Sequence, residues 1–267
     1  MTDNLPQKPK TFIADLNEFD KNEKSLHMSV SAKNLDRLKE LSIENLWLIG
    51  ANEKELRKIL PLVNLKYLNL YQILAKDLTI LEILDKTETI ILNWNTKSTS
   101  LWDISKNKSL KTLEITDFSK LEEIDQLSLA TQISDLTIGG GHDKLLKIKS
   151  INPLKNLTNL ITLSLTNLKI ADDTLQPLGH LKNLDTLFLS NQFETKEYAW
   201  LATRLLKTKC KMFQATNSCH IEGADNKLVW DTMITGRKKS FLLSTKDQVK
   251  IDKYIKDFEK LKNELAE

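Results

Sequence analysis

The chain has 267 residues, 40% of them hydrophobic, and a formal net charge of +3. This length and composition allow a continuous core in one large or two modest domains, while the small net charge argues against a strong electrostatic attraction to nucleic acid or to a membrane surface. No apolar run reaches the roughly 18 residues that a membrane-spanning helix needs, and the first ten residues lack the basic-then-apolar order of a secretory signal. We therefore expect a cytoplasmic protein with no membrane partner.

The chain begins with a polar stretch that contains Pro6 and Pro9, so residues 1–11 are predicted to be a flexible tail. Two short segments with alternating apolar and polar residues follow, over 11–16 and 26–31, and this period of two is typical of half-buried strands. The first unit of a stacked fold leaves its core open on one side and needs a cover. We assign residues 12–34 to an N-terminal cap.

A repeated apolar spacing dominates the middle of the chain. Residues 157–170 read Leu-Thr-Asn-Leu-Ile-Thr-Leu-Ser-Leu-Thr-Asn-Leu-Lys-Ile, with apolar residues three, three, two, three and two apart. This spacing resembles the leucine-rich repeat, L-x-x-L-x-L-x-x-N-x-L. The resemblance implies an α/β solenoid with a curved parallel β-sheet on the concave side and 3₁₀ or short helices on the convex side.

Aligning the sequence on the second leucine of the motif predicts seven strands, separated by 27, 22, 23, 23, 27 and 24 residues and centred on Leu41, Leu68, Ile90, Leu113, Leu136, Leu163 and Leu187. The 27-residue repeats leave room for a helical turn or two, as in residues 52–60. The position of the family's asparagine holds Leu46, Ile73, Asn95, Phe118, Gly141, Leu168 and Gln192, so only Asn95 conforms. We therefore expect packing to replace most of the polar ladder in the turns.

Beyond the last regular repeat, residues 193–206 have a helical period, with Thr195 as the predicted N-cap. Residues 210–214 are predicted to form an eighth, degenerate strand, which would extend the repeats over 35–213. The remaining residues, 214–267, are predicted to be a C-terminal cap in which segments 227–235 and 239–243 form a hairpin and residues 244–265 form a helix. This order of elements is similar to the C-terminal end of uncharacterised bacterial leucine-rich repeat proteins over residues 184–260.

The two cysteines, Cys210 and Cys219, are predicted to be free thiols. Together with His220 they could suggest metal ligands, but a fourth ligand at zinc spacing is missing. We expect no metal and no cofactor.

In such a solenoid the residues that flank the inward leucines face the concave side, because strand side chains alternate. None of the 21 flanking residues is Lys or Arg, and large and acidic side chains concentrate in the first repeats. Exposed aromatic residues on a rigid sheet favour protein contacts. We predict a non-catalytic interaction module, such as an adaptor, an inhibitor or an immunity-type protein, whose protein partner has a basic or mixed surface and contacts Glu40, Glu44, Tyr67, Asn69, Tyr71, Ile91, Asn93, Trp94, Glu114, Asp117, Asp135 and Phe188.

Two other functions stay open. An enzyme or regulatory subunit would use Glu114, Asp135 or His142, although no nucleophile and base occur at a recognisable spacing. Nucleic-acid binding would use Arg237, Lys238 and Lys239 together with the lysines of residues 246–262. Those lysines alternate with acidic residues, which is typical of a solvated helix face, so we expect no nucleic-acid partner. The sequence leaves the oligomeric state undetermined.

Overall fold

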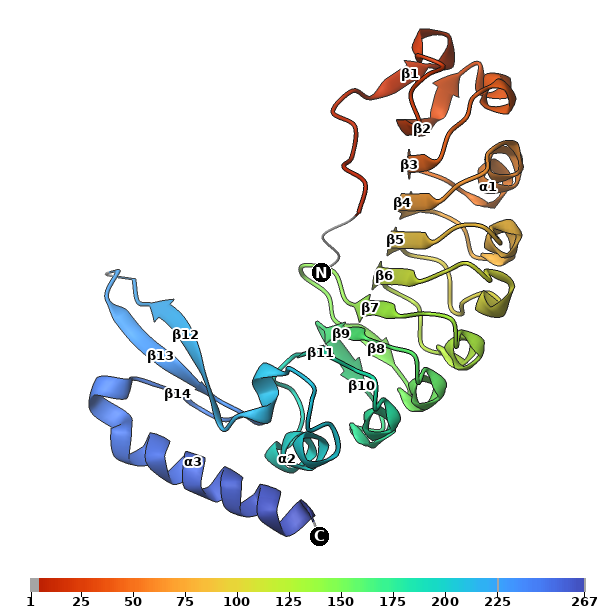
Figure 1. Ribbon diagram of the computed structural model, residues 1–267. Helices are drawn as coiled ribbons and strands as arrows, with labels where there is room; N and C mark the ends of the chain where they lie inside the picture. The colour runs from red at the N-terminus through yellow and green to blue at the C-terminus, as the bar shows by residue number, and fades with distance from the viewer. Residues whose placement is uncertain (1–4, 225, 267) are drawn as a thin grey trace.

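The computed structural model describes residues 5–224 and 226–266. Within them, nine parallel strands form one curved sheet in the order β1-β2-β3-β4-β5-β6-β7-β9-β11 (Figure 1). The predicted α/β solenoid with a parallel sheet is therefore confirmed. The strands are β1 (Ile13–Asp15), β2 (Ser25–Lys33), β3 (Asn45–Ile49), β4 (Tyr67–Ile73), β5 (Thr89–Asn95), β6 (Thr112–Phe118), β7 (Asp135–Gly139), β9 (Thr162–Thr166) and β11 (Thr186–Leu189).

The register of the sheet stacks the repeated apolar residues in rows. Leu68 pairs with Ile90, Ile90 with Leu113, and the row continues to Leu187 with every member at most 2% exposed. A single repeat cannot bury such a face, but stacked neighbours share one continuous core. The core therefore lies between the sheet and the outer helical layer.

The convex layer consists mainly of 3₁₀ helices, as the short repeats predict, and Figure 1 shows them along the outer side of the curve. They are η1 (Leu16–Glu18), η2 (Leu35–Glu40), η3 (Leu60–Leu62), η4 (Thr79–Ile83), η5 (Ile104–Lys106), η6 (Asp125–Leu129), η7 (Asn152–Asn156) and η8 (Gln176–His180). The predicted helix over residues 52–60 is confirmed as α1 (Glu53–Ile59). It begins with a capping box, because Asn52 accepts a bond from the Glu55 amide at 3.1 Å and Glu55 accepts one from the Asn52 amide at 2.8 Å.

The predicted alignment of the first repeat is wrong. Leu46 in β3 pairs with Leu68, whereas Leu41 lies just beyond the C-terminal end of η2, where its amide donates to the Leu38 carbonyl. Leu35, Leu38 and Leu41 are three residues apart, which is the spacing of the convex segment that precedes each strand. Leu41 therefore looks like the first strand leucine, although the strand starts only four residues later. The spacing to the next repeat is thus 22 residues, and the helix α1 occupies a short repeat.

The remaining 27-residue repeat, between Leu136 and Leu163, contains an unpredicted strand instead of a helix. This strand, β8 (Leu146–Ile148), pairs in parallel with β10 (Leu168–Ile170) in a separate two-stranded sheet. Gly140 lies where the chain leaves β7, and a Cβ there would overlap the carbonyl oxygens of Lys144 and Asn167. Gly140, the middle residue of the run Gly139-Gly-Gly141, therefore permits a close approach of the backbone.

Left-handed backbone recurs where the chain leaves the concave strands. Gly50, Gln72, Trp94, Asp117 and Asn167 have φ values of 80°, 60°, 62°, 56° and 52°. We call these five residues the left-handed row. The residue after each one turns into the core, and these residues are Ala51, Ile73, Asn95, Phe118 and Leu168, each at most 1% exposed.

Asn95 is the polar member of that buried set, as the family motif predicts. Its Nδ2 donates to the Ala75 carbonyl at 2.9 Å, and its Oδ1 accepts from the amides of Lys97 and Ser98 at 2.7 and 2.8 Å. The corrected register replaces Leu46 by Ala51 at the equivalent position of the first repeat. The other four members of this set, Ala51, Ile73, Phe118 and Leu168, have apolar side chains, so packing replaces the polar ladder in their turns.

The C-terminal part differs from the prediction in two elements. Residues 210–214 form no eighth strand; within the described chain only an isolated bridge joins Lys209 to Thr186, and residues Lys211–Phe213 form the 3₁₀ helix η9. Thr195 is the first residue of α2 (Thr195–Arg204) and not its N-cap, and its hydroxyl donates to the Thr235 carbonyl at 3.0 Å.

The predicted hairpin and terminal helix are confirmed. Strands β13 (Leu228–Ile234) and β14 (Phe241–Leu242) are antiparallel, and an unpredicted strand, β12 (Thr216–Glu222), pairs with β13 on the other side. Helix α3 (Ser244–Ala266) lies beside this sheet at the end of the solenoid (Figure 1). Its Ile251 packs in a small core with Ile234 and Leu242. In the part of the chain that the structure describes, no helix combines the length and apolarity needed to span a bilayer.

Candidate interaction surface

The concave face is the surface formed by the outward side chains of β2 to β11. The register places three such residues on most strands, for example Asn45, Trp47 and Ile49 on β3 opposite Tyr67, Asn69 and Tyr71 on β4. With the first repeat corrected and residues 25–29 of β2 included, none of these strand residues is Lys or Arg; β2 itself ends at the exposed Lys33. The rows comprise Ser25, His27, Ser29, Asn45, Trp47, Ile49, Tyr67, Asn69, Tyr71, Thr89, Ile91, Asn93, Thr112, Glu114, Thr116, Asp135, Thr137, Gly139, Thr162, Ser164, Thr166, Thr186 and Phe188.

A buried cluster lies on the concave face of the first repeats. Trp47, Tyr67 and Ile91 are only 5%, 5% and 8% exposed, and the rings of Trp47 and Tyr67 are 4.7 Å apart. The sequence prediction contained Tyr67 and Ile91 but missed Trp47. The sequence Leu46-Trp-Leu48, which stands 22 residues before Leu68-Asn-Leu70, is the signal that could have identified it.

An exposed aromatic pair lies beside this cluster. Tyr71 and Trp94 are 45% and 38% exposed, and their ring centroids are 5.6 Å apart in an edge-on arrangement. Trp94 belongs to the left-handed row, with φ at 62°. A bulky residue in this conformation carries strain of about 1–2 kcal/mol, and the same conformation at Gln72 and Asp117 shows that it belongs to the turn of the repeat.

The polar residues around the pair differ in their contacts. The Asn69 side chain donates to the Tyr67 hydroxyl at 3.3 Å, and the Asn93 side chain donates to the Thr116 hydroxyl at 2.8 Å. Asp117 lies in the left-handed row, and its carboxyl group occupies the space that a Cβ on Gly141 would need. The edge of the concave face near Trp94 therefore combines aromatic, amide and carboxylate groups.

Two carboxylates of the concave face lie on β6 and β7. Burial raises the pKa of Glu114, which faces the concave side between Ile91 and Thr137. Asp135 accepts a hydrogen bond from the Ser134 hydroxyl at 2.7 Å. The sheet thus brings acidic groups to its middle, next to the buried cluster.

Glu40 and Glu44 do not lie on the concave strands, so their predicted positions are wrong. Glu40 ends η2, and Glu44 precedes β3 at the start of the strand. Glu44 forms ion pairs with Lys24 at 2.5 Å and with Lys66 at 2.9 Å, and hydrogen bonds from these lysines lower its pKa to about 2. Its charge is therefore used to join neighbouring repeats.

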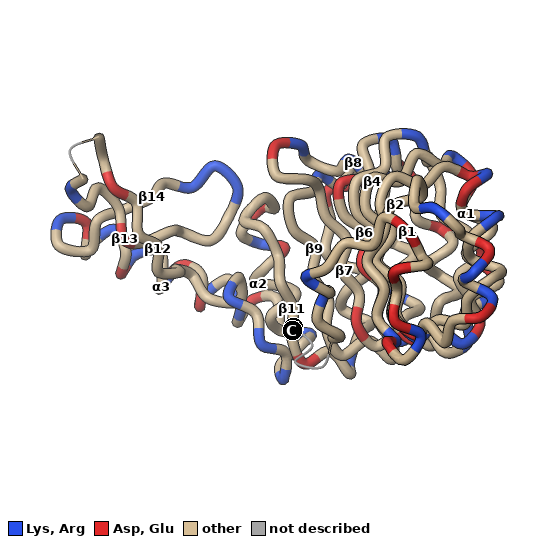
Figure 2. Tube along the Cα trace, turned by 90° about the horizontal axis from the view of Figure 1, so that it is seen from above, with Lys and Arg blue, Asp and Glu red and all other residues tan. Residues whose placement is uncertain are grey.

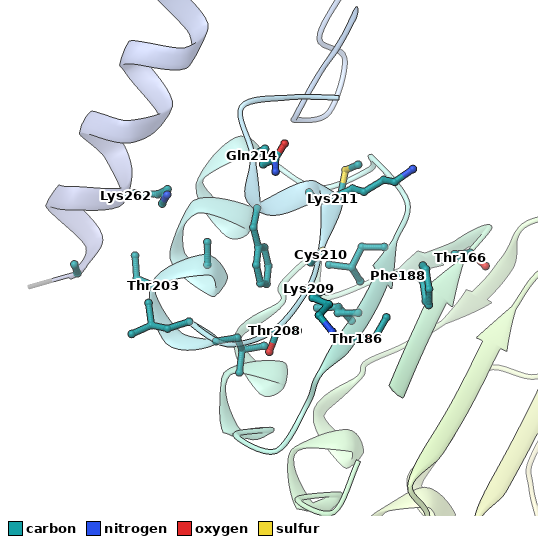
Figure 3. Close-up of a pocket in the computed structure, with 18 of the residues that line it drawn as sticks. Thr166, Thr186, Phe188, Thr203, Thr208, Lys209, Cys210, Lys211, Gln214 and Lys262 are labelled. Carbon is teal, nitrogen blue, oxygen red and sulfur yellow. The ribbon is translucent and has the colours of Figure 1, made fainter. Parts of the chain in front are cut away.

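Phe188 belongs to β11, which lies at the other end of the sheet from β3 to β5 (Figure 1). It is 40% exposed and lines a cavity of about 1100 Å³ between β11, η9 and the end of α3. Figure 3 shows Phe188 beside Thr166, with Cys210 and Lys211 on the neighbouring segment and Lys262 on α3. Phe188 therefore belongs to a separate hollow.

The residues of the possible catalytic site lie in different settings. Glu114 pairs with Thr137 and Asp135 pairs with Thr112, so the two carboxylates occupy different rows. The side chain of His142 is 98% exposed in the loop after β7 and lies 2.8 Å from Asp143. Within the described chain, no group of three or more His, Cys, Asp or Glu side chains is arranged to hold a metal ion.

Several basic residues of the C-terminal part are paired with carboxylates. Arg237 contacts Asp173 and Glu194, and along α3 Lys250 and Lys262 pair with Asp247 and Glu259 at 2.8 and 3.1 Å. Figure 2 shows lysines and acidic residues interspersed along this helix, with a short basic stretch in the loop before β14. This arrangement differs from a basic stripe.

The fold is that of bacterial leucine-rich repeat proteins. Solved structures similar to this chain include two from Listeria monocytogenes, an internalin (TM-score 0.46, 19% identity, 71% of this chain and 62% of that one) and internalin C2 (0.46, 22%, 67% and 74%). A leucine-rich repeat protein from Leptospira interrogans has a TM-score of 0.51 and 20% identity over 70% of this chain and 51% of its own. The chain thus spans about half to three quarters of these proteins. No protein-family model and no curated protein sequence matches it.

Proposed function

We propose, from the leucine-rich repeat fold and the concave face described above, that the chain is a non-catalytic module that binds a protein partner. The observation that carries the proposal is the exposed pair Tyr71 and Trp94 on a rigid sheet, with Trp94 held in a strained left-handed conformation. Rigid, exposed aromatic side chains supply binding energy at small entropic cost. An adaptor, an inhibitor and an immunity-type protein all use a surface of this kind.

The charge of the concave face supports a partner with a basic or mixed surface. Its strands and the turns beside them carry Glu114, Asp117 and Asp135, and none of the residues of β3 to β7, β9 and β11 is basic. Complementary charge accelerates association and suppresses wrong partners. The pairing of the C-terminal lysines supports the absence of a nucleic-acid partner.

A cytoplasmic location is part of the proposal. Cys210 and Cys219 are unbridged thiols, and unbridged thiols are typical of reducing compartments. Burial raises the pKa of Cys210 to about 11, so this thiol is poorly suited to nucleophilic chemistry.

The test uses two matched double variants of the full chain. Tyr71→Ala with Trp94→Ala removes the proposed contact, and Trp230→Ala with Phe241→Ala removes an aromatic pair that is exposed at 40% for each residue at the other end of the molecule. Each immobilised variant captures proteins from a lysate of the cells that express the chain, and mass spectrometry identifies those that the natural chain retains.

Truncating a hot-spot aromatic residue costs about 2 kcal/mol or more, so the first variant is expected to lose at least about 30-fold in affinity for the partner. The second variant is expected to bind like the natural chain. Equal capture by both variants would show that the concave pair does not bind the partner.

A further inference from the structure

The N-terminal segment, residues 5–12, has the sequence Leu-Pro-Gln-Lys-Pro-Lys-Thr-Phe and no regular secondary structure. Its two prolines, Pro6 and Pro9, are half-buried, while Gln7, Lys8 and Lys10 are exposed. Burial of every third residue is the pattern of a polyproline II helix, which has three residues per turn and no internal hydrogen bonds. The prolines therefore form the inward face of an extended segment.

Contacts with His27 place this segment on the concave face. The Phe12 ring lies edge-on to His27 with 5.0 Å between the ring centroids. The pKa of His27 is lowered, first by burial and then by the charge of Lys8, and is partly restored by the Pro9 carbonyl. From this point Figure 1 shows the segment running down the concave side of the sheet toward its middle.

Burial of the concave face is greatest on β2 to β5, next to the cap from which the segment extends (Figure 1). His27, Trp47, Tyr67 and Ile91 are between 5% and 9% exposed, whereas Phe188, in the same row as His27, Trp47 and Ile91 but at the far end of the sheet, is 40% exposed. We call these four buried residues the aromatic hollow. Side chains on the open face of a sheet are normally half-exposed, so the hollow has the burial of a covered site.

The chemistry of the hollow matches an extended proline segment. Grooves lined by aromatic rings bind Pro-x-x-Pro sequences, because the polyproline II helix is already ordered and its rings stack on aromatic faces. His27 adds a buried imidazole, and the Pro9 carbonyl beside it raises its pKa.

We infer that the aromatic hollow is a binding site for an extended segment of the type Pro-x-x-Pro, and that Pro6-Gln-Lys-Pro9 of this chain occupies it in cis. The inference rests on the proposed function, since it names the class of partner segment that the concave face binds. The positive charges of Lys8 and Lys10 meet no like charge on β3 to β7, β9 and β11, because these strands contain no Lys or Arg. A partner segment of this type displaces residues 5–12 and then gains the exposed pair Tyr71 and Trp94.

The affinity of residues 5–12 for the aromatic hollow has a lower limit, because the segment is docked in the intact chain. A short tether gives an effective concentration of about 1 mM, so a segment that is docked in cis binds as a free peptide with a Kd of about 1 mM or tighter. The tethered copy weakens binding of the same peptide in trans about 10-fold if its own Kd is about 0.1 mM. Release of the tethered copy is therefore measurable with the peptide itself.

The experiment compares three full-length chains. The released variant carries Pro6→Gly, Pro9→Gly and Phe12→Ser, and the matched control carries Gln7→Ser and Thr11→Ser, which change exposed residues of the same segment. The probe is a fluorescein-labelled peptide with the sequence of residues 5–12, and fluorescence anisotropy measures its binding. Circular dichroism confirms that all three chains melt at similar temperatures, as expected for changes outside the sheet.

The released variant is expected to bind the probe about 10-fold more tightly than the natural chain and the control do. A probe with both prolines replaced by glycine should not bind, and Trp47→Ala in the released variant should abolish binding. Equal binding of the probe to all three chains, or equal binding of the proline-free probe, would overturn the inference.

The two proposals fail in different ways. If the probe does not bind but a captured partner is lost from the Tyr71 and Trp94 variant, the proposed function stands and the proline site is wrong. If the probe binds the released variant while the partner is captured regardless of Tyr71 and Trp94, the site stands and the exposed pair is not the partner's contact.

Discussion

Asn95 is the residue whose replacement tests the polar interior of the turns most directly. It is fully buried, and its side chain makes three hydrogen bonds to the backbone of residues 75, 97 and 98. In Asn95→Ala two amides and one carbonyl lose their partner. An unsatisfied buried group costs about 1–3 kcal/mol, so we expect a loss of about 3–5 kcal/mol after partial access of water.

The matched control is Asn93→Ala, two residues earlier in β5. Asn93 lies on the opposite face of the sheet, is half-buried and makes one side-chain bond, to the Thr116 hydroxyl at 2.8 Å. Its loss should cost about 0.5–1.5 kcal/mol. Urea unfolding followed by circular dichroism compares the two variants, and hydrogen exchange of β4 to β6 detects local opening if the solenoid does not unfold as one unit.

A cost of Asn95→Ala equal to or below that of Asn93→Ala would refute this account of the turn. Asn95→Leu provides a second check, because leucine restores apolar volume but no hydrogen bonds. Since the equivalent positions hold Ile73 and Phe118 without a polar ladder, a nearly neutral Asn95→Leu would mean that packing alone supports this turn.

Three further predictions follow from contacts outside the binding surface. The two lysine partners of Glu44 lower its pKa from 4.5 to about 2. Its contribution to stability is therefore present above pH 4.5 and is lost as the pH falls toward 2. In urea unfolding titrations at several pH values, Glu44→Gln should show a weaker loss of stability over this pH range. Gly140→Ala should destabilise the chain more than Gly50→Ala, because a Cβ at 140 overlaps backbone whereas at 50 it meets open space and only the φ of 80° is unfavourable; thermal melting compares them. Cys210, with its pKa raised to about 11, should react with a thiol reagent far more slowly in the folded than in the unfolded chain.

Each of these outcomes has a contrary result. An unchanged acid transition in Glu44→Gln would show that its ion pairs do not stabilise the fold. Equal melting temperatures for the two glycine variants would contradict the close approach at Gly140, and equal reaction rates in both states would contradict the burial of the Cys210 thiol.

The sequence predicts the solenoid because the core rows repeat in the chain itself. Copies such as residues 157–170 contain every inward position, and the capping residues Asn52 and Glu55 mark the start of α1. The first repeat is harder to predict, because Leu35, Leu38 and Leu41 continue the three-residue spacing into the region before the strand. Because the first repeat was aligned on Leu41 in place of Leu46, Glu40 and Glu44 were wrongly predicted to lie on the concave face and Trp47 was not predicted there.

Other features depend on contacts that no local pattern contains. Strand β12 has the sequence Thr-Asn-Ser-Cys-His-Ile-Glu, in which little apolar alternation distinguishes it from a loop. Residues 5–12 contact the concave face at His27, which lies 15 residues after Phe12 in the chain. No local sequence pattern predicts this contact. Tyr71 and Trp94 are exposed, as expected of contact residues on the concave face, but the burial of Tyr67 and Ile91 follows only from the three-dimensional structure.

The left-handed row has a consequence for how this molecule can change. At Gln72, Trp94 and Asp117 three different side chains occupy the same left-handed backbone, and the residue that follows each of them is buried in the core. Side chains along this edge can therefore be exchanged with nearly constant stability, one repeat at a time. New binding specificities could be selected from a library restricted to these positions, with glycine or asparagine as the least strained starting points.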